Sequence, residues 1–124
     1  MIKSQFRVIY PEEMADAEIP PYGGRYRLEM EYKDFIERSQ PLFDEYEQTG
    51  RIHEVEALIG KPMVGLSDKE EWLLDFEHCM LGPDCVTFEE HDGKYVISSN
   101  GSHRLFVAKK YGLKLLVKVR WWED

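Results

Sequence analysis

The order of hydrophobic and polar positions divides the first half of the chain into short elements. An apolar run over 6–10 predicts a short strand, and residues 11–24, rich in proline and glycine, predict irregular structure. From about residue 27, apolar side chains recur at helical spacing, which predicts a helix. Its apolar stripe consists of Leu28, Tyr32, Phe35 and Ile36. Because proline is poor inside a helix but suits its first turn, Pro41 predicts a break and a second short helix over 41–48.

The middle of the chain combines an alternating segment with a clear helix start. Residues 51–59 begin with strand-like alternation, which predicts a strand ending at Gly60. Further on, Ser67 and Glu70 have the spacing of a capping box, in which serine and glutamate satisfy each other's backbone amides. The helix predicted from there has an apolar face made of Trp72, Leu73, Phe76 and Met80.

The last third of the chain has the clearest pattern. Residues 86–90 and 94–98 flank Asp92-Gly93, a strong signal for a β-hairpin. A helix is predicted over 102–111, and an alternating strand over 115–121. With the upstream helices these elements predict the α+β class, a small mixed sheet with helices packed on it.

Composition and charge narrow the function. A chain of 124 residues is long enough for one domain, and its start predicts neither a signal peptide nor a membrane span, so we expect a cytoplasmic protein with Cys79 and Cys85 reduced. The net charge of −8 argues against tight nonspecific binding to nucleic acid. Residues 93–122, however, carry seven basic residues and no acidic one, so the rest of the chain carries −15. A basic segment in an acidic protein points to an anion site.

A candidate for that site is the turn from Asn100 through Gly101, Ser102, His103 and Arg104. A helix that starts after a strand presents free backbone amides, glycine allows an anion to approach, and arginine can bind a phosphate with two parallel hydrogen bonds. The residues alone leave a second reading equally open. In that reading Ser102 is an ordinary helix cap, His103 a surface residue, and Arg104 a partner for the acidic half.

The same region resembles the core of the ParB/sulfiredoxin superfamily. The resemblance is carried by residues 92–113, in which a hairpin strand runs into a Gly-x-x-Arg turn, a helix and a Gly-Leu pair, and by the strand at Val117–Val119. Upstream, Ile52–Ile59 resembles the first strand of the family, and Leu66–Met80 the helix before the hairpin. The resemblance divides the chain into a helical N-terminal extension, residues 1–50, and a ParB/sulfiredoxin-like core, residues 51–124.

The resemblance implies a nucleotide or phosphate pocket at Gly101–Arg104, with ATP or CTP and Mg²⁺ as the expected ligands. Lys69 corresponds to a nucleotide contact from the preceding helix. Sulfiredoxins have a nucleophilic cysteine where this chain has Ser102, and His103 stands where ParB proteins have an arginine. Ser102 and His103 are therefore the catalytic candidates, but the sequence does not decide whether the protein is an enzyme.

Three functions remain open. The first is nucleotide or phosphate binding, with phosphoryl transfer or hydrolysis as an extension. The second is a noncatalytic acidic interaction protein of the immunity or anti-defence type, which binds a basic protein partner. The third is a ParB-type nuclease or DNA-associated protein, which the acidic charge disfavours. The histidine spacing predicts no metal site of the protein's own.

Overall fold

The computed structural model describes residues 1–14, 26–91, 94–97 and 101–124 as a mixture of helices and strands. The predicted α+β class is therefore confirmed. In chain order the elements are β1 (Ile2–Ile9), the short 3₁₀ turn η1 (Pro11–Glu13), α1 (Tyr26–Thr49), α2 (His53–Glu56), α3 (Asp68–Met80), β2 (Thr87–His91), β3 (Lys94–Ile97), α4 (Ser102–Lys110) and β4 (Leu115–Trp122). No helix in these ranges is long and apolar enough to cross a membrane.

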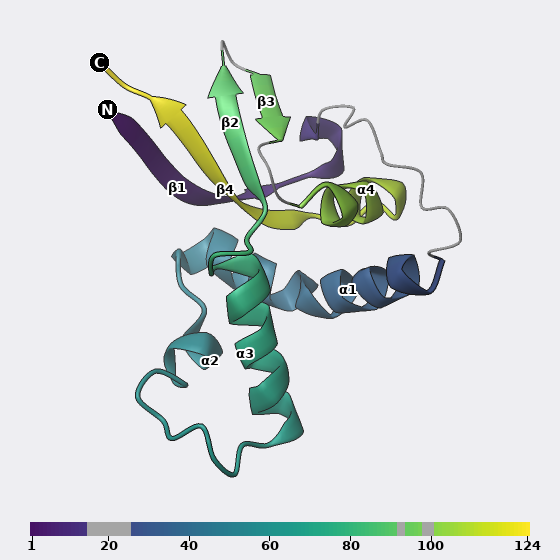
Figure 1. Ribbon diagram of the computed structural model, residues 1–124, viewed down its shortest axis with the longest axis vertical. Coiled ribbons are helices and arrows are strands. Elements are labelled where there is room, and N and C mark those ends of the chain that lie inside the picture. Colours follow the sequence, from purple (N-terminus) through teal and green to yellow (C-terminus); the bar gives the residue numbers. More distant parts are fainter. Residues whose placement is uncertain (15–25, 92–93, 98–100) are drawn as a thin grey trace.

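The four strands form one mixed sheet in the order β1-β4-β2-β3 (Figure 1). β1 and β4 pair antiparallel along their whole length, from Ile2 opposite Trp122 to Ile9 opposite Leu115. β2 pairs with β4 in parallel from Thr87 to Glu89 and then diverges from it, as the ribbon shows. β3 closes the sheet as the antiparallel partner of β2, which confirms the predicted hairpin; its Asp92-Gly93 turn lies outside the described residues.

The core lies between the sheet and the helices. α1 lies beside α4 and contacts β1 and β4, while α2 and α3 extend away from the sheet at the end opposite the termini (Figure 1). The largest fully buried side chains come from both halves of the sequence and include Ile9, Ile36, Phe43, Phe76, Met80, Leu105, Leu115 and Leu116. Residues 1–50 and 51–124 therefore share one sheet and one core.

α1 continues through Pro41, so the predicted break into two helices is wrong. An internal proline costs about 3 kcal/mol because it removes a hydrogen bond and crowds the preceding turn. Ile36 and Phe43 on either side of it are both fully buried, and burying two such side chains stabilises the helix by about 3–6 kcal/mol. Burial on both sides of the proline thus outweighs its local preference.

The predicted strand over 51–59 is also wrong, because His53–Glu56 forms the short helix α2. The buried residues of this segment are Ile52, Val55 and Leu58, which recur every third residue rather than every second. That spacing places them on one side of a helical turn. The strand that the family resemblance assigns to Ile52–Ile59 is consequently absent.

The other predicted elements are present. α3 starts at the predicted capping box, in which the Glu70 amide donates to the Ser67 hydroxyl at 3.2 Å and the Ser67 amide donates to the Glu70 carboxylate at 3.1 Å. α4 and β4 match their predictions to within one residue. β1 is longer than predicted, because its exposed first half carries no hydrophobic alternation and is held by backbone pairing with β4.

Candidate functional site

Gly101 connects the hairpin to α4 in a conformation that only glycine adopts without strain. Its φ is +101°, in the left-handed region, and it forms the N-cap of α4 without a side-chain cap. A Cβ atom at this position would lie 2.7 Å from Cγ2 of Val86, a buried residue next to β2. Glycine is thus required here by backbone conformation and by packing, whether or not an anion approaches the turn.

Arg104 lies one turn into α4 and is only 8% exposed. Its Nη1 donates to the carbonyl of Cys79 in the last turn of α3, and its Nη2 to the carbonyl of Asp84, each at 2.5 Å. The guanidinium therefore ties α4 to the end of α3 and to the loop that follows. Both acceptors are neutral, and Arg104 makes no ion pair with any described residue.

An open groove of about 490 Å³ lies beside this guanidinium, between α1 and the end of α3. We call it the Arg104 groove; it is lined by Leu28, Glu31, Tyr32, Phe35, Cys79, Asp84 and Arg104. His103 is half-buried next to it, with its ring centroid 6.4 Å from that of Tyr32. The groove thus combines aromatic rings, one buried cation and two carboxylates.

The Cys79 thiol is the one sulfur atom among the residues that line the Arg104 groove. Burial raises its pKa, Asp75 and Asp84 raise it further, and the positive charge of Arg104 only partly opposes them. The protonated thiol is a weak nucleophile. The raised pKa of Cys79 therefore disfavours it as a substitute for the nucleophilic cysteine that sulfiredoxins have at the position of Ser102.

Most of the basic segment is used inside the molecule. Lys110 forms a 2.8 Å ion pair with the buried carboxylate of Glu29, which joins α4 to α1. Lys114 pairs with Asp44 of α1, and Arg120 pairs with Glu89 across the sheet. Three of the seven basic side chains of residues 93–122, whose charge predicted an anion site, are thus neutralised by carboxylates of the same chain.

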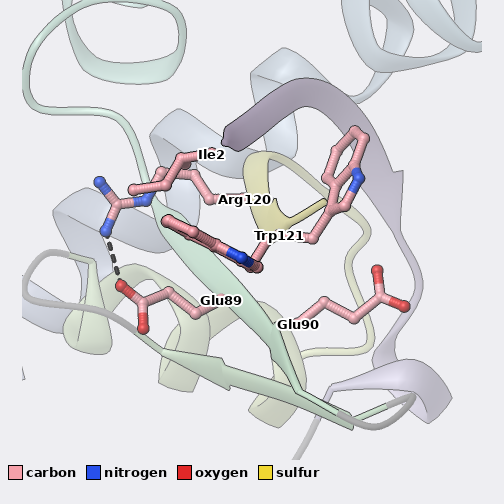
Figure 2. A pocket seen from close by; sticks show the side chains of 6 residues that line it. Ile2, Glu89, Glu90, Arg120 and Trp121 are labelled. Carbon is pink, nitrogen blue, oxygen red and sulfur yellow. Dashed lines mark hydrogen bonds and ion pairs between the residues drawn. The ribbon is translucent and has the colours of Figure 1, made fainter. Parts of the chain in front are cut away.

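Arg120 also lines a smaller hollow of about 180 Å³, where β2 and β4 diverge. Figure 2 shows its guanidinium turned toward Glu89, 2.6 Å away, with Trp121 and Glu90 on the other side of the hollow. Because Glu89 already neutralises this cation, the hollow is less suited to a phosphate than a site whose arginine has no ion-pair partner.

The structure brings together only part of the predicted site. Gly101, His103 and Arg104 lie at the start of α4, where Ser102 is the first helical residue; the side chain of Ser102 and all of Asn100 lie outside the description. Lys69 is in the first turn of α3 and pairs with Glu54 at 3.3 Å. Along the axis of α3 it is about 15 Å from Cys79, so it does not reach the groove.

Six groove residues were not among the predicted site residues: Leu28, Glu31, Tyr32, Phe35, Cys79 and Asp84. Tyr32 belongs to the predicted apolar stripe of its helix and could be identified only as a core candidate. Cys79 and Asp84 reach the groove because their carbonyls accept the hydrogen bonds of Arg104, a contact across 20 or more residues that leaves no local pattern.

The described residues contain no cluster of three or more metal-ligating side chains. No family model matches the chain, and neither a curated protein nor a solved structure is similar to it. The fold and the site therefore define an α+β protein with a groove beside a buried arginine, and the geometry of that groove is the basis for a function.

Proposed function

We propose that this protein binds a phosphate-bearing ligand, with a nucleotide as the preferred class, in the Arg104 groove. The observation that carries the proposal is the buried guanidinium of Arg104, whose two hydrogen-bond acceptors are both neutral carbonyls. A charge taken out of water is normally paired with an opposite charge. An anion in the groove would supply that charge, and the remaining N–H groups of the guanidinium could donate to it.

Other features of the groove support a nucleotide over a bare anion. Tyr32 and Phe35 offer aromatic surface, on which a base can stack. Glu31 and Asp84 give two carboxylates, about the number that Mg²⁺ takes from a protein when it also binds phosphate oxygens. The start of α4 also places the positive end of the helix dipole next to Arg104. The resemblance to the ParB/sulfiredoxin superfamily favours ATP or CTP.

The proposal concerns binding. Ser102 and His103 are the candidates for phosphoryl transfer or hydrolysis, because a hydroxyl and an imidazole beside a bound phosphate can accept the phosphoryl group or move a proton. Both stand at the start of α4, next to Arg104.

Calorimetric titration with ATP and CTP, with and without Mg²⁺, tests the proposal. Glu31→Gln is the informative variant, because it changes the charge of the groove and leaves the Arg104 hydrogen bonds in place. We expect Mg²⁺-dependent binding that Glu31→Gln changes several-fold and that Glu37→Gln, an exposed carboxylate of the same helix outside the groove, leaves unchanged. Absence of binding at millimolar nucleotide, or equal affinities in both variants, would refute the proposal.

A second candidate is a noncatalytic acidic protein that binds a basic partner. It is favoured by the net charge of −8, which the internal ion pairs of Lys110, Lys114 and Arg120 leave unchanged because each also neutralises a carboxylate. A stoichiometric complex with a basic protein, formed equally well without nucleotide, would support it. Nucleotide-dependent formation of that complex would instead favour the first candidate.

A further inference from the structure

The loop between α2 and α3 exposes large hydrophobic side chains. Ile59 is 80% exposed, Met63 68% and Val64 86%. In the described part of the chain, the other highly exposed large hydrophobic residues, Met1, Ile2 and Trp122, lie at the paired ends of β1 and β4. A local concentration of exposed apolar surface is typical of an interaction site.

A groove of about 340 Å³ adjoins these side chains, between α2 and α3. We call it the α2–α3 groove; its apolar lining consists of Val55, Leu58, Ile59, Met63, Leu74 and Leu81. Its charged lining is acidic, from Glu56 and Glu77. It shares no lining residue with the Arg104 groove, and Figure 1 shows α2 and α3 at the end of the molecule farthest from the termini.

The surroundings of the α2–α3 groove carry an excess of negative charge. Residues 51–81 contain seven acidic and three basic side chains. All three cations already form ion pairs within the segment: Arg51 with Glu56 at 2.6 Å, Lys61 with Glu70 at 3.2 Å, and Lys69 with Glu54 at 3.3 Å. The other four carboxylates, Asp68, Glu71, Asp75 and Glu77, are exposed and form no ion pair with a described residue.

The geometry of α3 places this charge along the apolar lining. Leu74, Glu77 and Leu81 follow one another at spacings of three and four residues and thus share one face of the helix. Glu71 and Asp75, four residues apart, lie on the adjoining face, which is exposed. An apolar strip bordered by carboxylates therefore runs along a helix about 20 Å long.

We propose that the α2–α3 groove docks a basic amphipathic helix of a protein partner. The apolar face of that helix covers Ile59, Met63 and Val64, and its lysine or arginine side chains meet Glu71, Asp75 and Glu77. Charge complementarity selects this occupant, because a second copy of the chain or an anionic membrane would bring like charges together. The proposal does not depend on nucleotide binding, but it gives the second candidate function a specific surface.

A fluorescent helical peptide of leucine and lysine, about as long as α3, tests the proposal by anisotropy titration against the full chain. We expect saturable, salt-sensitive binding that the Ile59→Ser/Val64→Ser double variant weakens about tenfold or more. Asp75→Asn/Glu77→Gln should weaken binding several-fold at low salt and reduce its salt dependence. Ile2→Ser, an exposed apolar position at the far end of the molecule, and Glu37→Gln are the matched controls and should bind like the wild type.

A peptide with glutamate in place of lysine has the same apolar face and the opposite charge, so it should not bind. Equal binding of both peptides, no binding of the lysine peptide, or an unchanged affinity of the double variant would each overturn the proposal. Sedimentation of the wild type tests whether a second copy of the chain occupies the groove instead. Self-association that the double variant abolishes would assign the groove to a dimer and contradict the proposal.

Discussion

At the residue scale, two residues at the start of α4 stabilise the fold. Gly101 allows the chain to pass beside Val86, and Arg104 donates a hydrogen bond to a carbonyl in the last turn of α3. Both residues belong to the Gly-x-x-Arg pattern that suggests a phosphate site from sequence. The structure thus gives each of them a role in folding, in addition to the one proposed in binding.

Replacing Gly101 by alanine should destabilise the protein strongly. The new Cβ would sit in the left-handed region and 2.7 Å from Val86, so we expect a loss of about 2–4 kcal/mol in the free energy of unfolding. Gly112→Ala is the matched control: its φ is +68°, but no atom lies within 4 Å of the added Cβ, so about 1 kcal/mol is expected. Urea denaturation measures both, and equal losses would show that the Val86 contact is unimportant.

Arg104→Met should reduce stability by about 2–4 kcal/mol, because it leaves the carbonyls of Cys79 and Asp84 without a donor in a buried position. Arg120→Met removes an ion pair with Glu89 whose side chains are 39% and 41% exposed, so its cost should stay within about 1 kcal/mol. Thermal or urea unfolding compares the two variants. Similar losses would show that the two carbonyl hydrogen bonds of Arg104 stabilise the protein no more than an exposed ion pair does.

The Cys79 thiol should react slowly with iodoacetamide at pH 8, because its raised pKa leaves little thiolate. Asp75→Asn removes a negative charge that raises this pKa, so the pKa should fall, the thiolate fraction increase and the reaction accelerate. Mass spectrometry of the peptide that contains Cys79 measures the rate. Glu77→Gln serves as the control on the same helix, and an equal acceleration in it would refute the assignment to Asp75.

At the element scale, burial explains the two elements that local sequence patterns predict wrongly, α1 and α2. α1 contains Pro41 in its interior because Ile36 and Phe43 are buried on both sides of it. The centroid of the Phe43 ring lies 5.9 Å from that of Phe76 on α3, so the part of α1 that follows Pro41 packs against α3. α2 exists because Ile52, Val55 and Leu58 face the same core.

Pro41→Ala distinguishes the continuous helix from two helices. In a continuous helix alanine restores a backbone donor and removes a clash, so stability should rise by about 1–3 kcal/mol. If a new helix started at Pro41, proline would suit its first turn and alanine would be neutral or destabilising. Circular dichroism during urea unfolding gives the difference, and a loss of stability would contradict the structure of α1.

At the scale of the whole molecule, the two ends of the chain complete one sheet. β1 pairs with β4 over eight residues, and Glu29 of α1 binds Lys110 of α4. Lys114 likewise binds Asp44 of α1, so two cations of the basic last third form ion pairs with the acidic first half. The surface that remains is acidic around α3, which agrees with a basic partner rather than with a nucleic acid.

The fragment 51–124 should not fold on its own. The fragment lacks β1 and the buried residues Ile9, Ile36 and Phe43. The edge of β4 and the apolar face of α3 are therefore exposed in it. We expect poor dispersion in its NMR spectrum and no cooperative unfolding transition, and recovery of both on adding a peptide of residues 1–50. A well-dispersed spectrum of the fragment alone would show that 51–124 is an independent domain.

Local features determined the elements that the sequence predicts correctly. The capping box at Ser67, the hairpin strands around Asp92-Gly93, and the start of α4 after Gly101 depend on neighbours a few residues apart, which a sequence displays directly. The Gly-x-x-Arg turn was visible for the same reason. The groove around it was not, because α1 and the end of α3 come to it from more than 20 residues away.

The sequence by itself therefore determined the α+β class, the C-terminal strands and helices, and Arg104 as the residue of interest. Only the tertiary structure decided that Pro41 lies inside a helix, that α2 is not a strand, and that three of the seven basic residues of the last third are neutralised by ion pairs. The reason is the same in each case: burial and ion pairing act between residues distant in sequence, and their free energy exceeds the local preference. For Arg104 both contribute: the sequence motif identifies the residue, and the tertiary structure buries it.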